Sequence, residues 1–179
     1  MRPFPAACHP YLVLRADRAA AVPSASGANL MDNCHEYREQ GVRVGPSAFG
    51  LGVFSLRSFS AREVVGPIEG RIFDGDLYES DYCMALGDHS ALEPEAPFRF
   101  LNHCCQPNCS LLEYEVEYDD GTGGSELWLA VETDIEPGEQ MTIDYGWPAR
   151  SAIPCGCGSP ECRKWIVAAE ELGEVESDS

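Results

Sequence analysis

The sequence predicts a mostly β domain built from short strands. The 17 glycines and 13 prolines indicate frequent turns, several short runs alternate apolar and polar residues, and one segment alone has the apolar spacing of a helix. The 179 residues are enough for one domain with a hydrophobic core. The hydrophobic fraction of 44% is typical of a globular protein.

Residues 1–41 differ from the rest of the chain. They are rich in alanine, and residues 24–27 read Ser-Ala-Ser-Gly, which is typical of a linker. We therefore expect an N-terminal extension over 1–41 that is poorly ordered in part. Alternating patterns then predict strands at 42–44, 52–58 and 63–68, the last interrupted by Gly66 and Pro67.

The clearest strand pattern lies in the second half of the chain. Over 112–118, leucine, tyrosine and valine alternate with glutamate at a period of two. The glycine-rich stretch 119–124 turns the chain, so that 127–131 can pair back as a hairpin. Next, Pro137 and Gly138 occupy the central positions of a predicted type II turn, and a further strand is expected over 140–145.

One helix is predicted near the C-terminus, over residues 161–172. Trp165, Ile166, Ala169 and Leu172 form its apolar stripe. Residues 173–179 follow as an acidic tail.

The net charge of −18 comes from 30 acidic and 12 basic residues. Direct binding to a nucleic-acid backbone is not expected, because phosphate contacts need clustered lysine and arginine. A basic peptide is a more natural partner. The alternative is that the charge serves solubility alone, as blocks of like charge usually do.

The chain contains nine cysteines, an odd number. Charged residues and prolines interrupt every apolar run at the N-terminus, so neither a secretory signal nor a membrane span is expected. These observations favour a soluble intracellular protein whose thiols bind metal rather than form disulfides.

Cys155, Cys157 and Cys162 have the spacing of a metal site. Glycines between them let the backbone bend so that several sulfurs converge on one tetrahedral ion. A structural zinc site needs a fourth thiolate, and the spacing leaves Cys104, Cys105 and Cys109 open as its source. Unrelated free thiols are the alternative.

Three further segments carry functional side chains. Gly50 and Gly52 permit close approach of the backbone to a ligand, although a glycine turn before a strand explains them equally well. The segment 99–109 brings Asn102 and His103 next to cysteines, and Tyr145 ends a strand. Taken singly, a histidine or tyrosine of this kind is more often a core residue.

Together these segments resemble the SET-domain lysine methyltransferases that carry a post-SET zinc motif. The similarity runs from about residue 42 to 165 in the family's order. It covers the glycine-rich segment 49–54, the strand at 66–72, the Arg-Phe-x-Asn-His signature at 99–109, the second signature at 136–146 and the cysteines at 155–162.

The resemblance implies a SET fold of several small antiparallel sheets with a pseudoknot, a SET domain over 42–149, and a post-SET zinc motif and helix over 150–172. It implies S-adenosylmethionine as the cofactor and one structural zinc ion. Tyr145 is the implied catalytic residue, the implied cofactor residues are Leu51, Gly52, Asn102, His103, Tyr145 and Trp147, and the implied zinc ligands are Cys105, Cys155, Cys157 and Cys162.

The implied activity is methyl transfer to the side-chain amine of a lysine in a basic protein or peptide, with a histone tail as the family analogy. The implied location is cytoplasmic in a bacterium, and nuclear or cytoplasmic in a eukaryote. Ile68 replaces a tyrosine that many members carry, which removes one phenol from the lysine channel. The alternative function is therefore a non-catalytic SET module that binds a peptide or protein partner. Cys104 replaces the usual serine, a small change.

Overall fold

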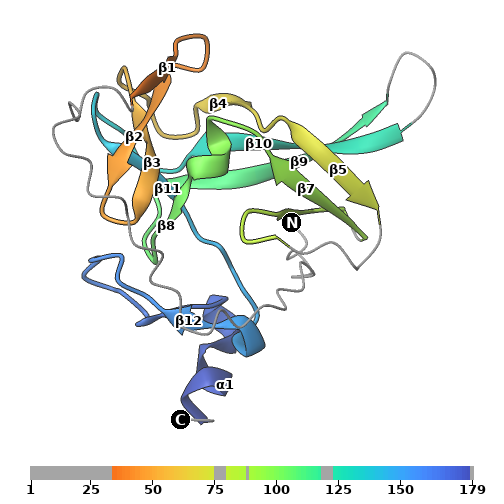
Figure 1. Ribbon diagram of the computed structural model, residues 1–179, viewed down its shortest axis with the longest axis vertical. Coiled ribbons are helices and arrows are strands. Elements are labelled where there is room, and N and C mark those ends of the chain that lie inside the picture. The colour runs from red at the N-terminus through yellow and green to blue at the C-terminus, as the bar shows by residue number, and fades with distance from the viewer. Residues whose placement is uncertain (1–33, 75–79, 88, 118–122, 178–179) are drawn as a thin grey trace, which may run out of the picture.

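The described part of the chain forms four small β-sheets joined by loops, as the computed structural model in Figure 1 shows. The structure describes residues 34–74, 80–87, 89–117 and 123–177. Most of the predicted N-terminal extension, most of the turn at 119–124 and the end of the acidic tail lie outside these residues. The predicted fold class, mostly β with small and largely antiparallel sheets, is confirmed.

The largest sheet has five strands in the order β1-β2-β3-β11-β8. β2 and β3 form a tight hairpin in which Ser47 pairs with Gly50, and Gly50 has a φ of +86°, which glycine adopts without strain. The strands are β1 (His35–Tyr37), β2 (Val42–Ser47), β3 (Gly50–Ser55), β8 (Asn102–His103) and β11 (Gln140–Ile143).

β8 and β11 pair in parallel, whereas the other pairs in this sheet are antiparallel. Asn102 lies opposite Thr142, and His103 lies opposite Ile143. The two signature segments of the sequence therefore lie side by side, and β3 borders β11 on its other edge (Figure 1).

The predicted hairpin forms the second sheet. β10 (Gly123–Val131) pairs with β9 (Cys109–Glu117) on one side and with β4 (Val64–Pro67) on the other. The predicted turn before β11 is also present: Gly138 has a φ of +88°, and the Glu139 N–H donates to the Glu136 carbonyl at 3.1 Å.

Two smaller sheets complete the fold. One has the order β5-β7-β6, with β5 (Gly70–Asp74), β6 (Met84–Leu86) and β7 (Ser90–Pro94). The other pairs β12 (Ile153–Pro154) with β13 (Trp165–Ile166). A short 3₁₀ turn, η1 (Phe98–Phe100), leads into β8, and a second, η2 (Ala149–Ser151), precedes β12.

One hydrophobic core joins the first three sheets. It contains Val53, Phe59, Phe98, Leu129 and Met141, each less than 3% exposed. Residues from β3, β10 and β11 contribute to it. The strands that carry the signature segments therefore pack against this core.

The helix predicted over 161–172 is wrong. Trp165 and Ile166 form β13 instead, and they pair with Pro154 and Ile153. A 3₁₀ turn, η3 (Ala169–Glu171), and the short helix α1 (Leu172–Ser177) follow. The residues of the predicted stripe share no buried face: Trp165, Ile166 and Leu172 are half-buried and Ala169 is exposed, whereas the buried residues are Val167 and Ala168. No helix in the described part of the chain is long and apolar enough to cross a membrane.

Candidate functional site

Asn102 joins β8 to the start of β3. Its Nδ2 donates to the Leu51 carbonyl at 3.0 Å and to the Ser47 hydroxyl at 3.1 Å. A Cβ at Gly52 would lie 2.6 Å from the Gln140 side chain and 3.1 Å from Asn102 Nδ2. The sequence therefore needs glycine at position 52 to bring these groups together.

Leu51 and Phe49 stand at the edge of this cluster, 38% and 57% exposed. β11 pairs only with Val53 and Phe54 of β3, so Leu51 and Gly52 lie beyond that ladder, next to the Asn102 amide. An exposed strand edge with apolar side chains and a fixed amide can accept a small molecule that has both polar and apolar parts.

His103 is buried, and both of its ring nitrogens contact other parts of the protein. Tyr145 N–H donates to Nδ1 at 3.2 Å, and Nε2 lies 3.3 Å from the Cys105 sulfur. A neutral ring with its proton on Nε2 satisfies both contacts. Burial lowers the pKa of His103, which agrees with a neutral ring. The imidazole therefore links the segment of Tyr145 to the cysteine cluster.

Tyr145 points its hydroxyl back into the fold. The phenol donates to the Leu101 carbonyl at 2.9 Å, and burial raises its pKa to about 12. Its ring centroid lies 5.4 Å from that of His103 and 5.3 Å from that of Trp147. At neutral pH the group is a protonated phenol that can align a partner by hydrogen bonding, and it is not a base.

Tyr82 is a neighbour that sequence reasoning missed. Its phenol contributes electrostatically to the raised pKa of Tyr145, after the larger effect of burial. The Arg99 guanidinium lies 3.8 Å from the centre of the Tyr82 ring, and Arg99 in turn pairs with Glu93. No motif surrounds Tyr82 in the sequence. Its neighbour Arg99 does lie in a signature segment, and that position is the sequence signal that points to this region.

Ile68 is 5% exposed and belongs to the hydrophobic core. An aliphatic side chain therefore occupies the position at which many SET-domain lysine methyltransferases carry a tyrosine.

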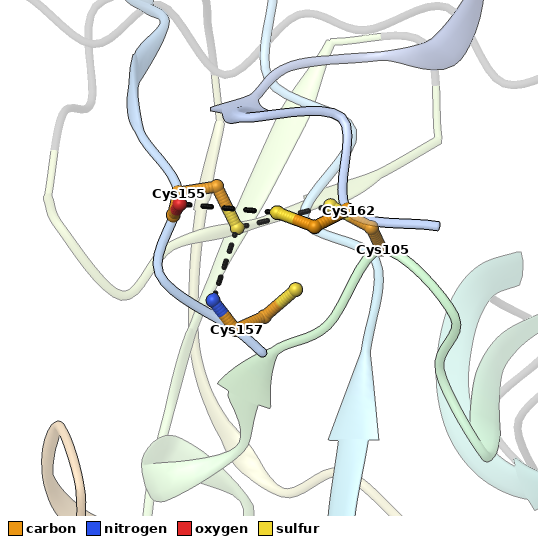
Figure 2. A group of neighbouring side chains, drawn as sticks. All are labelled: Cys105, Cys155, Cys157 and Cys162. Atoms are coloured by element: carbon orange, nitrogen blue, oxygen red, sulfur yellow. Dashed lines mark hydrogen bonds between the residues drawn. The ribbon is translucent and has the colours of Figure 1, made fainter. Parts of the chain in front are cut away.

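Four cysteines converge in space (Figure 2), namely Cys105, Cys155, Cys157 and Cys162. Their sulfurs all lie within 4.8 Å of one another, and those of Cys105 and Cys155 are 3.7 Å apart. A tetrahedral zinc ion with Zn–S bonds of about 2.3 Å separates its sulfurs by about 3.8 Å. The four thiols therefore fit a structural zinc site.

Backbone N–H groups point at these sulfurs. Arg163 N–H lies 3.4 Å from the Cys105 sulfur, and Lys164 N–H lies 3.4 Å from that of Cys162. Burial opposes ionisation of Cys157, but N–H donors from Cys105 and Ser159 lower its pKa to about 6. These donors favour the thiolate form that a metal site requires.

The remaining two cysteines of the signature segment are not part of this group. Cys109 is fully buried, and burial raises the pKa of its thiol to about 12. Burial also raises the pKa of Cys104, which is close enough to Cys157 to interact with it. Of the three candidates that the spacing left open, the structure brings Cys105 to the cluster.

The protein is a small β protein in which a four-cysteine cluster lies beside the strand of Asn102 and His103 and near the half-buried Tyr145. Residues 50–146 match the SET domain family, a match that spans more than half of the 179 residues. The chain belongs to the SET domain family.

Several curated relatives are similar in sequence. The chain is 38% identical over 132 residues to the histone-lysine N-methyltransferase trithorax of Drosophila melanogaster, covering 65% of this chain and 3% of that protein. It is 29% identical over 154 residues to the "Histone-lysine N-methyltransferase, H3 lysine-4 specific" of Schizosaccharomyces pombe, covering 76% of this chain and 16% of that protein. The chain thus spans a small part of these relatives.

A solved structure supports the fold. KRYPTONITE, crystallised with methylated DNA, a histone H3(1-15) peptide and S-adenosylhomocysteine (SAH), superposes with a TM-score of 0.57. The identity is 24%, and the match covers 69% of this chain and 29% of that chain. At this identity the likeness concerns the fold alone.

Proposed function

We propose that the protein is an S-adenosylmethionine-dependent protein-lysine N-methyltransferase. Membership of the SET domain family and the names of the curated relatives support this activity. The main structural support for the proposal is that the segments of Asn102 and Tyr145 lie side by side. The Asn102 amide bonds to the Leu51 carbonyl on one side, and on the other side Tyr145 follows β11, the strand that pairs with β8.

The residues around β3 and β8 suit the proposed cofactor. Its amino-acid end would meet the backbone at Leu51 and Gly52 and the amide of Asn102. Because both His103 nitrogens already contact protein, His103 would contribute its backbone. Tyr145 and Trp147 would add aromatic surface. When bound, S-adenosylmethionine supplies an electrophilic methyl group.

Tyr145 would hold the substrate amine in line. A lysine with a pKa near 10.4 is neutral in only about one molecule in a few thousand at pH 7. A channel that excludes water lowers this pKa, and the positive cofactor repels the ammonium further. The Tyr145 hydroxyl, with a pKa of about 12, remains protonated and orients the amine, so positioning supplies most of the rate.

The substrate proposed is a lysine in a basic protein segment, with a histone tail as the first candidate. The chain carries a net charge of −18, which favours encounter with a basic peptide. The relatives are named as histone-lysine methyltransferases, and the KRYPTONITE complex contains a histone H3 peptide. A histone substrate would place the protein in the nucleus.

The zinc ion would be structural. We assign residues 42–149 to the catalytic SET domain and 150–172 to a zinc motif held by Cys105, Cys155, Cys157 and Cys162. Four thiolates leave no open position on a tetrahedral ion, so the metal would stabilise the fold rather than take part in the reaction.

A non-catalytic SET module that binds a peptide is the second candidate. Ile68 favours it, because this core position has no phenol to offer a substrate amine.

Incubation of the protein with labelled S-adenosylmethionine and recombinant histones distinguishes the two candidates. We expect labelling of a histone by the wild type, loss of labelling in Tyr145→Phe, and no change in Tyr114→Phe, whose ring is 45% exposed on β9. SAH binding is measured in parallel by calorimetry. SAH binding without labelling of any histone or lysate protein would favour the non-catalytic module.

A further inference from the structure

Arg163 reaches from the cysteine cluster to the segment of Tyr145. It directly follows Cys162, and its backbone N–H contacts the Cys105 sulfur at 3.4 Å. Its guanidinium Nη2 donates to Asp144 Oδ1 at 2.7 Å. Arg163 thus connects the C-terminal cysteine motif to Asp144, the residue before Tyr145.

Asp144 holds the backbone that follows Tyr145. Its Oδ1 accepts the Gly146 N–H at 3.2 Å. It also lies 3.4 Å from His103 Nδ1, but with the ring neutral and Nδ1 accepting the Tyr145 N–H, this approach is not a hydrogen bond. Gly146 has a φ of +59°, so the chain bends sharply after Tyr145. The position of this carboxylate therefore constrains the turn that directly follows Tyr145.

The contact between Arg163 and Asp144 is largely shielded from water. The two side chains are 13% and 32% exposed, and Arg163 Nε is buried without a hydrogen-bond partner among the described residues. Burying a guanidinium in this way is costly unless its remaining contacts are strong and well oriented. An exposed ion pair would tolerate movement of its partners, whereas this geometry holds Asp144 at one place.

We propose that Arg163 is a positioning residue for methyl transfer, which acts on Tyr145 through Asp144 and the turn at Gly146. This inference rests on the proposed methyltransferase function. The cysteine cluster fixes the Arg163 backbone, Arg163 fixes Asp144, and Asp144 fixes the turn that aims the Tyr145 phenol. Arg163 contacts neither substrate nor cofactor in this scheme.

The matched variants are Arg163→Gln and Arg38→Gln, which make the same substitution inside and outside the proposed site. We expect Arg163→Gln to lower kcat about tenfold or more while the KM for S-adenosylmethionine changes little, because misalignment affects the reacting geometry more than ground-state binding. Arg38→Gln, at a side chain that is 84% exposed, keeps the wild-type kcat. Bound zinc, measured by mass spectrometry, remains one ion per chain in both variants.

Two further variants separate positioning from general stability. Arg163→Lys restores one charged donor to Asp144 and is expected to recover most of the kcat. The double variant Arg163→Gln/Asp144→Asn is expected to be no slower than the slower single variant, since both changes break one contact. An unchanged kcat in Arg163→Gln, additive losses in the double variant, or a loss that only parallels zinc loss would overturn the proposal.

Amide hydrogen exchange gives a readout that does not depend on activity. Arg163→Gln should raise exchange about tenfold or more at the Tyr145 and Gly146 amides, because the loss of Asp144 restraint permits local opening. The amides of the distant hairpin β9–β10 should be unaffected. Faster exchange together with an inactive wild type would contradict the proposed function while leaving the structural coupling intact. Unchanged exchange would refute the coupling itself.

Discussion

The Asn108 side chain binds the backbone of Thr142. Its Oδ1 accepts the Thr142 N–H at 2.8 Å, and its Nδ2 donates to the Gln140 carbonyl at 2.9 Å. Asn108 closes the segment that begins at β8, and Thr142 lies in the strand that leads to Tyr145. β8 has only two residues, so the Asn108 side chain makes hydrogen bonds to Gln140 and Thr142 that a longer β8 would make.

Replacing Asn108 with alanine should destabilise the protein by about 2 kcal/mol, because two backbone groups of β11 lose their partners. Asn108→Asp keeps the acceptor for Thr142 but loses the donor to Gln140, so a smaller loss is expected. Denaturant unfolding monitored by tryptophan fluorescence measures both. Equal stability of Asn108→Ala and wild type would show that the contact contributes nothing to stability.

The strands could be predicted because their signals are local. Alternation over 112–118 and the Pro137-Gly138 turn both depend on neighbouring residues, and the structure has β9, β10 and the turn at those places. The helix at 161–172 failed for the opposite reason. Residues around Cys162 bend so that its sulfur meets Cys105, a partner 57 positions away, and Lys164 has a φ of +69°. A periodicity window contains no such constraint.

The residues of the candidate site likewise divide into those that the sequence predicts and those that it does not. Asn102, His103 and Tyr145 lie in motifs whose order is visible in the sequence, and the structure brings them together. Tyr82 and Arg163 lie outside any such pattern of functional residues. They reach the site only because the chain folds back, Tyr82 beneath Arg99 and Arg163 onto Asp144.

Gly52→Ala should weaken SAH binding about tenfold or more, because the new methyl group would meet the Gln140 and Asn102 side chains at 2.6 and 3.1 Å. Asn102 would then lose its contact with Leu51. Gly173→Ala is the matched control, since a Cβ there meets no atom within 4 Å. Titration calorimetry with SAH measures both variants, and equal affinities would contradict the proposed cofactor site.

Purified wild-type protein should contain about one zinc ion per chain, and Cys157→Ser should lose it. Removal of zinc should lower the melting temperature, because a ligand that binds only the folded state stabilises that state. Cys34→Ser, at an exposed cysteine outside the cluster, should keep both the metal and the melting temperature. A folded, metal-free wild type would argue against the site.

Stability should fall as the pH rises above 9. The Cys109 thiol has a pKa raised by burial from 9.0 to about 12, so the native state keeps a proton that the unfolded state releases in this interval. The stabilisation is fully present below pH 9 and declines by about 1.4 kcal/mol per pH unit above it.

Cys109→Ala isolates this contribution. Between pH 9 and 10, its free energy of unfolding should decline less steeply than that of the wild type, because no thiol at position 109 remains to be deprotonated. Tyr145, with a pKa raised from 10.0 to about 12, should still make both proteins less stable above pH 10. Denaturant unfolding at half-unit pH steps measures the two slopes. Parallel curves between pH 9 and 10 would mean that the Cys109 thiol ionises as easily in the folded protein as in the unfolded chain.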